Sequence, residues 1–550
     1  MLLARGWVLK AAFTLRFCCG LFHQTFAGLG VEAEAAERLA QREKLIAFAD
    51  EDNRRNTANL CSKKVLQRKN STGIISVSWI YSENLNSLNC SRGNRGTSSE
   101  GEDIMSQHSG TREQWGSKIG FILAAGGSAV GLGNIWRFPY VAGKYGGASF
   151  ILFYLFVVCV IGFTVMLTEM ALGKHYQLSC VSAFRQYKGG KFTFMGVIVT
   201  LIGTFILSYY MVIGGWTIKY IVSSLSGLMG EAAAGHSGDL FGAFISSPNQ
   251  VLLYHVIFVL LTSLIVFGGI KGGIERVCKV MMPALFVILL VMIVRSLTLP
   301  GASKGLEFYM LPDFSKLTLE GCLAAIGQAF FSLSLGMGIM ITYGSYVKKD
   351  EYLPSAVAQV CVIDTLVAVL AGFVIFPAAF AFSIEVNSGP GLTFITLPSI
   401  FAKMPGGAIW STLFFVLFFF AAITSSISLL EVPVACLIDT MKMSRKKATV
   451  VATILVFVLG VPSALGLGSH AFDIAGKGFL DFIDFITNNI GMPVMAALTS
   501  LFVGWLIPKD ILPELDSTTR VFTHKNLWLF CVRFVAPAVI LVIFVTGLKW

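Results

Sequence analysis

The most informative feature of this sequence is how little charge it carries. Only 13% of its 550 residues are Asp, Glu, Lys or Arg, whereas 55% are hydrophobic and 45 are Phe. This composition excludes a soluble protein with a large core and predicts a chain that crosses a bilayer many times. The formal net charge is +11, but Lys and Arg occur mostly in short segments between apolar runs. There they orient a membrane protein, and we expect no nucleic-acid partner.

Motifs of enzymes and metal sites are also missing. The 11 Cys residues form no CxxC pair, the seven His residues form no HExxH pattern, and neither GxSxG nor a P-loop is present. Several Cys residues, including Cys159, Cys361 and Cys436, fall within apolar runs, which argues against a zinc site or a disulfide framework. We therefore expect neither an enzyme nor an organic cofactor.

The first part of the chain differs from the rest. Residues 1–104 are polar and rich in Gly, Ser and Asn in their second half, a composition typical of disorder. We expect Met105 to be the natural start, residues 1–104 to be a non-native or disordered extension, and residues 105–550 to form one transmembrane domain.

Apolar runs of about 20 residues, the length that a bilayer demands, recur through this domain. Basic and acidic connecting segments alternate, so the positive-inside rule predicts a multi-pass protein of the plasma membrane with a cytoplasmic N-terminus. An odd number of spans places Trp550 on the extracellular or periplasmic side. The eleven predicted spans are 116–140, 148–172, 192–224, 250–268, 274–299, 320–346, 354–383, 408–438, 447–466, 478–507 and 526–548.

Two of these spans are interrupted by poor helix formers. Six glycines fall between Gly116 and Gly133, and span 320–346 carries Ser332, Ser334, Gly336 and Gly338 at mid-length. Such residues either allow close helix packing or break the helix where its backbone lines a site. The interrupted spans are five apart, so we expect an all-α integral membrane protein with a five-plus-five inverted repeat, unwound helices one and six, and an eleventh span.

Three sequence motifs resemble the neurotransmitter:sodium symporter family, especially its prokaryotic amino-acid-transporting branch. They are GSAVGLGNIWRFPY in the first span, GQAFFSLSLGMG in the sixth and FFFAAITSSIS in the eighth. The resemblance covers about residues 112–548 and leaves the extension uncovered. It implies a symporter that imports hydrophobic or aromatic L-amino acids with sodium by alternating access.

The resemblance implies two sodium sites built from oxygen atoms, which suit a hard cation. Without it, Thr424 and Ser425 would more simply bond carbonyls of their own helix. Site one would use Ala129, Asn134, Ser332 and Asp364, and site two would use Gly127, Val130, Ala421, Thr424 and Ser425.

The resemblance also implies a substrate pocket at the two breaks. Monoamine-transporting relatives carry Asp where this chain has Gly131, so the substrate here must bring its own carboxylate. The residues that we expect around it are Ala129, Gly133, Tyr210, Phe331, Ser332, Ser334, Met337, Ser425 and Leu429. The side-chain positions among them are apolar and include an adaptable Met, which predicts a hydrophobic or aromatic substrate.

Asp364 is the main departure from the family pattern, because many members carry Asn there. An intramembrane carboxylate is a functional-site candidate by default. We expect Asp364 to ligate sodium and to supply the negative charge that chloride provides in animal relatives, so that transport is chloride-independent. The alternative is a structural Asp held by hydrogen bonds. Glu169 in the second span receives no role from the sequence.

The resemblance finally implies a gate on each side of the pocket. The outer gate would consist of Arg137, Asp484, Tyr210 and Phe331, and the inner gate of Arg112, Trp115, Ser345, Tyr346 and Asp439, with Glu431 nearby. From the residues alone, Arg137 could be a snorkelling side chain and Asp439 an ordinary loop charge.

Two other functions remain open at this stage: a sodium-gated channel that uses the same broken helices, and an amino-acid sensor that does not transport. The expected partners are an amino acid and the lipid bilayer. The sequence predicts no oligomeric state.

Overall fold

The computed structural model describes residues 112–384, 391–467 and 473–548. The predicted extension, residues 1–104, lies outside the described residues, as does Trp550. Residues 112–550 form a unit of their own, and the description below concerns that unit.

Long apolar helices make up most of this unit. Within the described residues, nine are long and apolar enough to cross a membrane, or ten when one bent pair is counted as a span. The nine are Ala148–Tyr176 (α4, η2, α5), Thr193–Leu225 (α7), Pro248–Phe267 (α10), Ile270–Leu297 (η4, α11), Leu353–Ala381 (α15), Gly407–Met441 (α17), Arg445–Leu465 (α18), Phe479–Leu506 (α19, η8, α20, η9) and Lys525–Gly547 (α22, η11, α23).

Shorter elements connect them. The connecting helices are Cys180–Arg185 (α6), Lys188–Gly190 (η3), Leu228–Ala233 (α8), Ser237–Ile245 (α9), Ala302–Met310 (α12), Phe314–Lys316 (η5), Leu392–Thr396 (η6), Leu397–Ala402 (α16), Pro508–Ile511 (α21) and Leu512–Leu515 (η10). Two short strands, Asp473–Ile474 (β1) and Lys477–Gly478 (β2), pair as an antiparallel hairpin. The all-α prediction missed this hairpin, and the apolar segment 392–402 was not predicted either.

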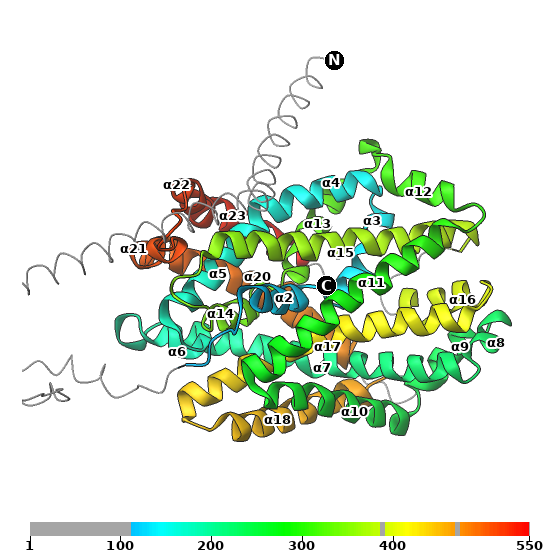
Figure 1. The fold of residues 1–550 in the computed structure, drawn as a ribbon, viewed down its shortest axis with the longest axis horizontal. Coiled ribbons are helices and arrows are strands. Elements are labelled where there is room, and N and C mark those ends of the chain that lie inside the picture. The colour runs from blue at the N-terminus through cyan, green and yellow to red at the C-terminus, as the bar shows by residue number, and fades with distance from the viewer. Residues whose placement is uncertain (1–111, 385–390, 468–472, 549–550) are drawn as a thin grey trace, which may run out of the picture. The chain divides into compact units, whose positions relative to one another are not determined.

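The two longest helices, α7 and α17, pack along each other in the interior, with α10 and α18 beside them (Figure 1). In each of α7 and α17, 78% of the most apolar window is buried, against 22% in Lys525–Gly547. The core is therefore built around α7 and α17, and the last span faces outward.

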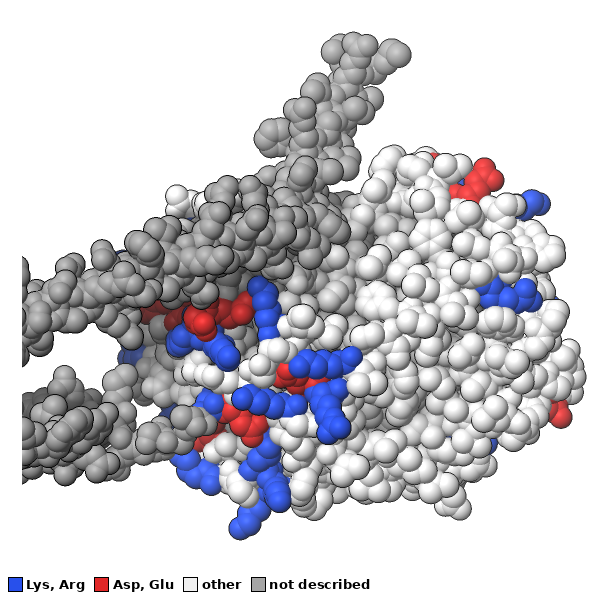
Figure 2. All heavy atoms as spheres, viewed as in Figure 1, with Lys and Arg blue, Asp and Glu red and all other residues white. Residues whose placement is uncertain are grey.

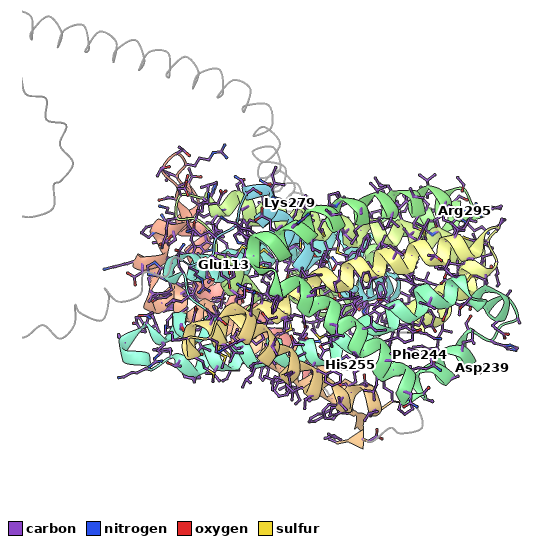
Figure 3. The ribbon with its side chains drawn as sticks, turned by 60° about the horizontal axis from the view of Figure 1, so that its bottom comes forward. Glu113, Asp239, Phe244, His255, Lys279 and Arg295 are labelled. Carbon is purple, nitrogen blue, oxygen red and sulfur yellow. The ribbon has the colours of Figure 1, made fainter. Side chains whose placement is uncertain are left out.

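Charged side chains separate along the length of the helices. On the face shown in Figure 2, Lys, Arg, Asp and Glu gather mainly toward one end, and a broad uncharged area lies between them and the few at the other end. Figure 3 places Glu113 and Lys279 toward the first end and Asp239 and Arg295 toward the second. An uncharged band between two charged ends is the surface that a bilayer requires.

The first predicted span is interrupted as expected. Helix α2 (Lys118–Ala129) stops, and the chain resumes helically at Gly133–Arg137 (η1) and Phe138–Lys144 (α3), with a bend of 55° between the two parts. Val130 adopts an extended conformation directly after α2. The backbone between Val130 and Leu132 is thereby released from the regular hydrogen-bond ladder, which exposes polar groups inside the protein.

The second interruption is longer. Helix α13 (Leu319–Ser332) and helix α14 (Ile339–Gly344) are separate, so 320–346 is not one continuous helix, and neither part alone has the length of a span. Gly336 and Gly338 have φ of +76° and +83°, a region that favours glycine. A Cβ on Gly336 would also lie only 2.3 Å from the carbonyl oxygen of Met492. Only glycine fits this turn.

Candidate functional site

The two breaks enclose a small cavity together with α7 and α17. Its volume is about 30 Å³, enough for roughly two water molecules. All nine residues predicted for the substrate pocket line it. The lining consists of Ser128, Ala129, Gly131, Leu132, Gly133, Asn134, Ile206, Tyr210, Phe331, Ser332, Ser334, Met337, Ile339, Ser425 and Leu429.

Four lining residues were missed by the sequence analysis: Ser128, Leu132, Ile206 and Ile339. Ile206 lies four residues before Tyr210 on α7 and therefore on the same helix face, which is a signal that the sequence contains. Of the other three, Leu132 lies in the first break, while Ser128 near the end of α2 and Ile339 at the start of α14 adjoin the breaks, whose limits the sequence does not show.

Asp364 on α15 is the only carboxylate among the residues predicted to bind sodium, and it is fully buried. Asn134 donates to its Oδ1 at 2.7 Å, and Ser332 donates to Oδ1 and Oδ2 at 2.7 and 2.9 Å. Tyr154 donates to Oδ2 at 3.4 Å. Within the described residues, no Lys or Arg pairs with Asp364, so neutral donors alone satisfy this carboxylate.

Oxygen atoms from the first break and from this carboxylate converge next to the cavity. Asn134 turns its Nδ2 toward Asp364, while its Oδ1 accepts from the Gly131 N–H at 3.1 Å. The structure thus brings Asn134, Ser332 and Asp364 into one hydrogen-bonded group, and Ala129 and Asn134 both line the cavity beside it.

A second group of oxygens lies where α17 meets the end of α2. The Ser425 hydroxyl is 3.4, 3.1 and 3.3 Å from the carbonyl oxygens of Gly127, Ser128 and Val130. Thr424 donates to Phe420 and Ala421 within its own helix, at 2.8 and 3.2 Å. Thr424 thus makes the bond that the simpler alternative expects, whereas Ser425 reaches across to the break.

Both oxygen groups are suited to an alkali cation by their chemistry. Their donors are carbonyls, hydroxyls, one amide and one carboxylate, the ligands that hard cations prefer. The described residues contain no group of three or more His, Cys, Asp and Glu that could hold a metal ion. By donor type, the two oxygen groups suit a hard cation such as sodium better than a transition metal.

Glu169 on α5 is a functional candidate that the sequence left without a role. Its side chain is 1% exposed, and its Oε1 accepts from the N–H of Gly336 at 2.8 Å. The carboxylate thus satisfies a backbone donor that the second break leaves free. The sequence signal was an acidic residue inside an apolar span.

At one end of the cavity, which we name the Arg112 end, ion pairs join several elements. Arg112 contacts both Asp439 oxygens at 2.9 Å, donates to Ser345 at 3.1 and 2.7 Å, and lies 4.7 Å from the Tyr346 ring centroid. Trp115 donates its backbone N–H to the Tyr346 carbonyl at 3.1 Å. All five residues predicted for the inner gate are therefore in contact.

A second ion pair, which the sequence did not predict, extends the Arg112 end. Arg445 binds both oxygens of the buried Glu431 at 2.8 and 2.9 Å and reaches Glu113 at 2.8 Å. Tyr346 donates to Glu431 at 2.5 Å. Glu275 accepts from the Gly116 N–H at 2.6 Å. The segment that precedes α2 is thus fastened from several sides.

The other end, which we name the Arg137 end, is built differently. A cavity of about 670 Å³ opens there, lined by Arg137, Phe331 and Asn488 among others. Arg137 lies over the Phe331 ring, 5.3 Å from its centroid. Asp484 accepts from Tyr209 at 2.9 Å and from Asn488 at 2.5 Å.

The predicted pair between Arg137 and Asp484 is therefore not formed in this structure, since no guanidinium nitrogen lies within 4.0 Å of an Asp484 carboxylate oxygen. Tyr209 and Asn488, which the sequence analysis did not single out, satisfy Asp484 instead. Tyr210, which was also predicted for the outer gate, accepts from the Leu132 N–H at 3.3 Å. At the Arg137 end a cavity reaches down to Phe331, whereas at the Arg112 end ion pairs join the surrounding elements.

Comparisons with known proteins give one consistent result. The sodium:neurotransmitter symporter family matches residues 112–237 and 243–549. The chain is similar to the "uncharacterized sodium-dependent transporter YhdH" of Bacillus subtilis, with 39% identity over 440 residues, covering 78% of this chain and 96% of that protein. It is also similar to an "uncharacterized sodium-dependent transporter" of Haemophilus influenzae, with 38% identity over 459 residues, covering 81% and 100%.

Among solved structures, the chain resembles the crystal structure of MhsT in complex with L-phenylalanine. The sequence identity is 43% and the TM-score 0.73, and the match covers 79% of this chain and 100% of that one.

Proposed function

This chain belongs to the sodium:neurotransmitter symporter family, and on that premise we propose that it imports hydrophobic or aromatic L-amino acids together with sodium. As a member of that family it is a sodium-dependent membrane transporter and not an enzyme. The amino-acid class, the site residues, the ion sites and the direction of transport are our proposal, and the following observations support them.

One observation carries the substrate class: two hydroxyl groups lie directly against Gly131. A Cβ at this position would lie 2.9 Å from the Ser425 hydroxyl and 3.1 Å from the Tyr210 hydroxyl. Glycine thus lets these two hydroxyls approach the backbone of the first break, and it brings no carboxylate of its own. In our proposal the substrate therefore supplies the carboxylate, facing the N–H groups of the first break, sodium and the Tyr210 hydroxyl.

The remaining contacts follow from the lining of the cavity. The substrate ammonium meets carbonyls of the second break near Phe331 and Ser334, where helical bonding is interrupted. The apolar side chain lies against Phe331, Met337 and Leu429, with Ile206 added by the structure. The L-phenylalanine complex of the similar MhsT supports an aromatic substrate. The full proposed set is Ala129, Gly133, Tyr210, Phe331, Ser332, Ser334, Met337, Ser425 and Leu429.

Sodium is a co-substrate in this proposal, bound at two sites. Site one uses Ala129, Asn134, Ser332 and Asp364, completed by the substrate carboxylate, so that ion and amino acid bind together. Site two uses Gly127, Val130, Ala421, Thr424 and Ser425. Each sodium ion that enters gains about 2.3 kcal/mol per 100 mV of membrane potential, and this gain drives accumulation of the amino acid.

Asp364 makes transport independent of chloride in this proposal. Its buried carboxylate has only neutral donors around it in the described residues, so it brings a negative charge that the sodium ion neutralises. We expect Asp364→Asn to reduce chloride-free uptake at least about 10-fold, because one charge-assisted contact contributes about 1.5–3 kcal/mol. Unchanged chloride-free uptake in this variant would contradict the role of Asp364.

The topology that we propose has eleven spans. The α13 and α14 pair counts as an interrupted sixth span, and the α2 and α3 pair as an interrupted first span. The spans form two five-span halves of opposite orientation plus one more. The N-terminus is cytoplasmic, the C-terminus is extracellular or periplasmic, and the membrane is the plasma membrane. The Arg112 end is then the inner gate and the Arg137 end the outer gate.

The cavity also supports alternating access. About 30 Å³ does not hold an amino acid, so Tyr210 and Phe331 must move before the substrate enters from the Arg137 end. The ion pairs at the Arg112 end must separate before it leaves. A protein with two such states, never open at both ends, moves its substrate without a continuous pore.

The test is uptake of tritiated tryptophan and leucine into proteoliposomes in chloride-free buffer, with and without an inward sodium gradient. We expect concentrative uptake only with the gradient, and mutual competition between the two substrates. Sodium-dependent binding without uptake would indicate a sensor. Absence of binding for both amino acids would contradict the substrate class.

A further inference from the structure

Arg533 is an arginine inside an apolar helix, and the transport proposal does not use it. It belongs to a π-helical turn, Cys531–Val535 (η11), within the membrane-spanning helix Lys525–Gly547. Within the described residues, no carboxylate lies within ion-pair distance of its guanidinium. An intramembrane charge without a partner is costly, and such residues commonly mark a functional site.

The structure shows what one part of this side chain does. Arg533 Nε donates to the carbonyl oxygen of Gly504 at 2.7 Å. Gly504 lies in the last π-helical turn of the preceding span, Phe502–Leu506 (η9), where carbonyls lack partners in their own helix. A Cβ on Gly504 would lie 3.1 Å from Arg533 Cγ, so glycine allows the close approach. Arg533 therefore caps the end of that span.

Capping leaves the rest of the guanidinium available. The two Nη groups make no hydrogen bond to any described residue, and the guanidinium carbon lies 5.2 Å from the Trp505 ring centroid. The Trp505 side chain is 53% exposed. Stacking on an exposed indole holds the guanidinium plane of an arginine in place, and its Nη groups then face away from the protein.

Trp505 places this pair near the end of a span. Trp505 is the penultimate residue of its span, and Pro508, Lys509 and Asp510 follow directly. Trp is enriched at the membrane–water interface. Exposed apolar side chains on the same two π-helical turns and their neighbours continue the surface toward the hydrocarbon region: Leu501, Leu506, Phe530 and Phe534.

We propose that Arg533 and Trp505 form a binding site for one anionic phospholipid, whose phosphate accepts hydrogen bonds from the free edge of the guanidinium. A fork of two N–H groups matches phosphate oxygens. The acyl chains lie along the exposed Phe530 and Phe534. The site is at the same end of the bundle as the basic connecting segments, where anionic lipids concentrate if that end is cytoplasmic.

The test is native mass spectrometry of the full chain, purified in detergent and supplied with phosphatidylglycerol or phosphatidylcholine. We expect the wild type to retain one phosphatidylglycerol that survives detergent washing. Arg533→Gln should lower its apparent affinity about fivefold, as expected for about 1 kcal/mol per basic residue near the lipid surface. Arg533→Lys should fall between the two, since it keeps the charge but loses the fork.

Arg520→Gln is the matched control. Arg520 lies in the segment that connects the spans of Trp505 and Arg533 and is exposed, so its loss should leave retention unchanged. Equal retention by wild type and Arg533→Gln would overturn the proposal, as would equal affinity of the wild type for phosphatidylcholine. If Arg533→Gln does not fold, the Arg533→Lys variant and the comparison of the two lipids still test the proposed phospholipid site. Neither outcome depends on transport.

Discussion

The two ends of the central cavity are held in different ways. At the Arg112 end, Arg112, Glu113 and Trp115 bind partners on four other elements, and the Arg112 and Asp439 side chains are only 14% and 10% exposed. At the Arg137 end, the corresponding charges make no direct pair, and a cavity of about 670 Å³ lies between the elements.

This difference indicates which end opens first. The Arg112 end is already closed in this structure, because its ion pairs and hydrogen bonds join the surrounding elements. Opening it requires several of them to break at once. A movement at the Arg137 end would break only a cation–π contact and hydrogen bonds among neighbouring groups. The structure is therefore closed by ion pairs at the Arg112 end, while at the Arg137 end Phe331 lies between the central cavity and the larger outer cavity.

The largest effect is expected from Arg112→Ala. Removing one partner of a buried ion pair costs about 3–5 kcal/mol, and even about 2 kcal/mol shifts a two-state equilibrium roughly 30-fold. We expect the Arg112 end to open and concentrative uptake to be lost. The measurement is maleimide labelling of Cys180, which is buried beneath this end with its Sγ 3.3 Å from the Gly338 carbonyl.

Two controls isolate this effect. Cys180→Ser removes the labelled thiol and should abolish the added signal. Arg520→Ala removes an exposed arginine and should label as the wild type does. Slow labelling of Cys180 in Arg112→Ala would show that this ion pair does not hold the end closed.

A smaller change at the same end is expected from Tyr346→Phe. It removes the hydrogen bond to Glu431 and leaves the aromatic ring beside Arg112. One hydrogen bond to a charged group contributes about 1.5–3 kcal/mol, and Arg445 still pairs with Glu431. We expect labelling of Cys180 between that of the wild type and that of Arg112→Ala. Labelling as fast as in Arg112→Ala would mean that the two contacts act as one unit.

Arg137→Ala tests the contrast from the Arg137 end. Since Arg137 makes no ion pair in this state, its removal should leave the labelling of Cys180 unchanged. Uptake should still fall, by about tenfold if the pair with Asp484 forms during closure and contributes about 1.4 kcal/mol. Faster labelling of Cys180 in this variant would show that the two ends are coupled already in this state.

The smallest effect concerns pH and the rim of the Arg112 end. Glu514 lies in η10, between the last two spans. Burial raises its pKa, but hydrogen bonds with His175 and Lys349 outweigh burial and hold the pKa below its ordinary value. Because the native pKa is depressed, this carboxylate stabilises the fold at neutral pH and loses that contribution as pH falls through the native value.

We therefore expect the thermal unfolding temperature of the wild type to fall as pH is lowered below about 4.5, the ordinary pKa region of Glu. Glu514→Gln should be less stable near neutral pH and should show a smaller decrease in that window. Parallel pH curves for the two proteins would contradict this role for Glu514.

The sequence predicted the breaks in the two helices better than it predicted the side-chain contacts at the ends of the cavity. Gly131, Gly336 and Gly338 mark the breaks because a helix that only crosses the bilayer does not need poor helix formers at its centre. The pocket residues then followed from the family resemblance. Segment 392–402 was missed because it is too short to be recognised as a span, and the hairpin because two-residue strands have no periodic pattern.

The pairs that close the Arg112 end were only partly predictable. Arg112 and Asp439 came from the resemblance, but Arg445 with Glu113 joins residues 332 positions apart. Nothing in either segment indicates the other. The same holds for Tyr209 and Asp484, which are 275 positions apart. Such contacts depend on the packing of whole helices, which local sequence patterns do not determine.

The most direct test of coupled transport is a paired flux measurement in one batch of proteoliposomes. Entry of radioactive sodium and of tritiated phenylalanine would be followed together, each with and without the other. We predict that each enters at a substantial rate only when the other is present, in a fixed ratio. Sodium entry at the same rate without phenylalanine would indicate a channel, and phenylalanine entry without sodium would contradict symport.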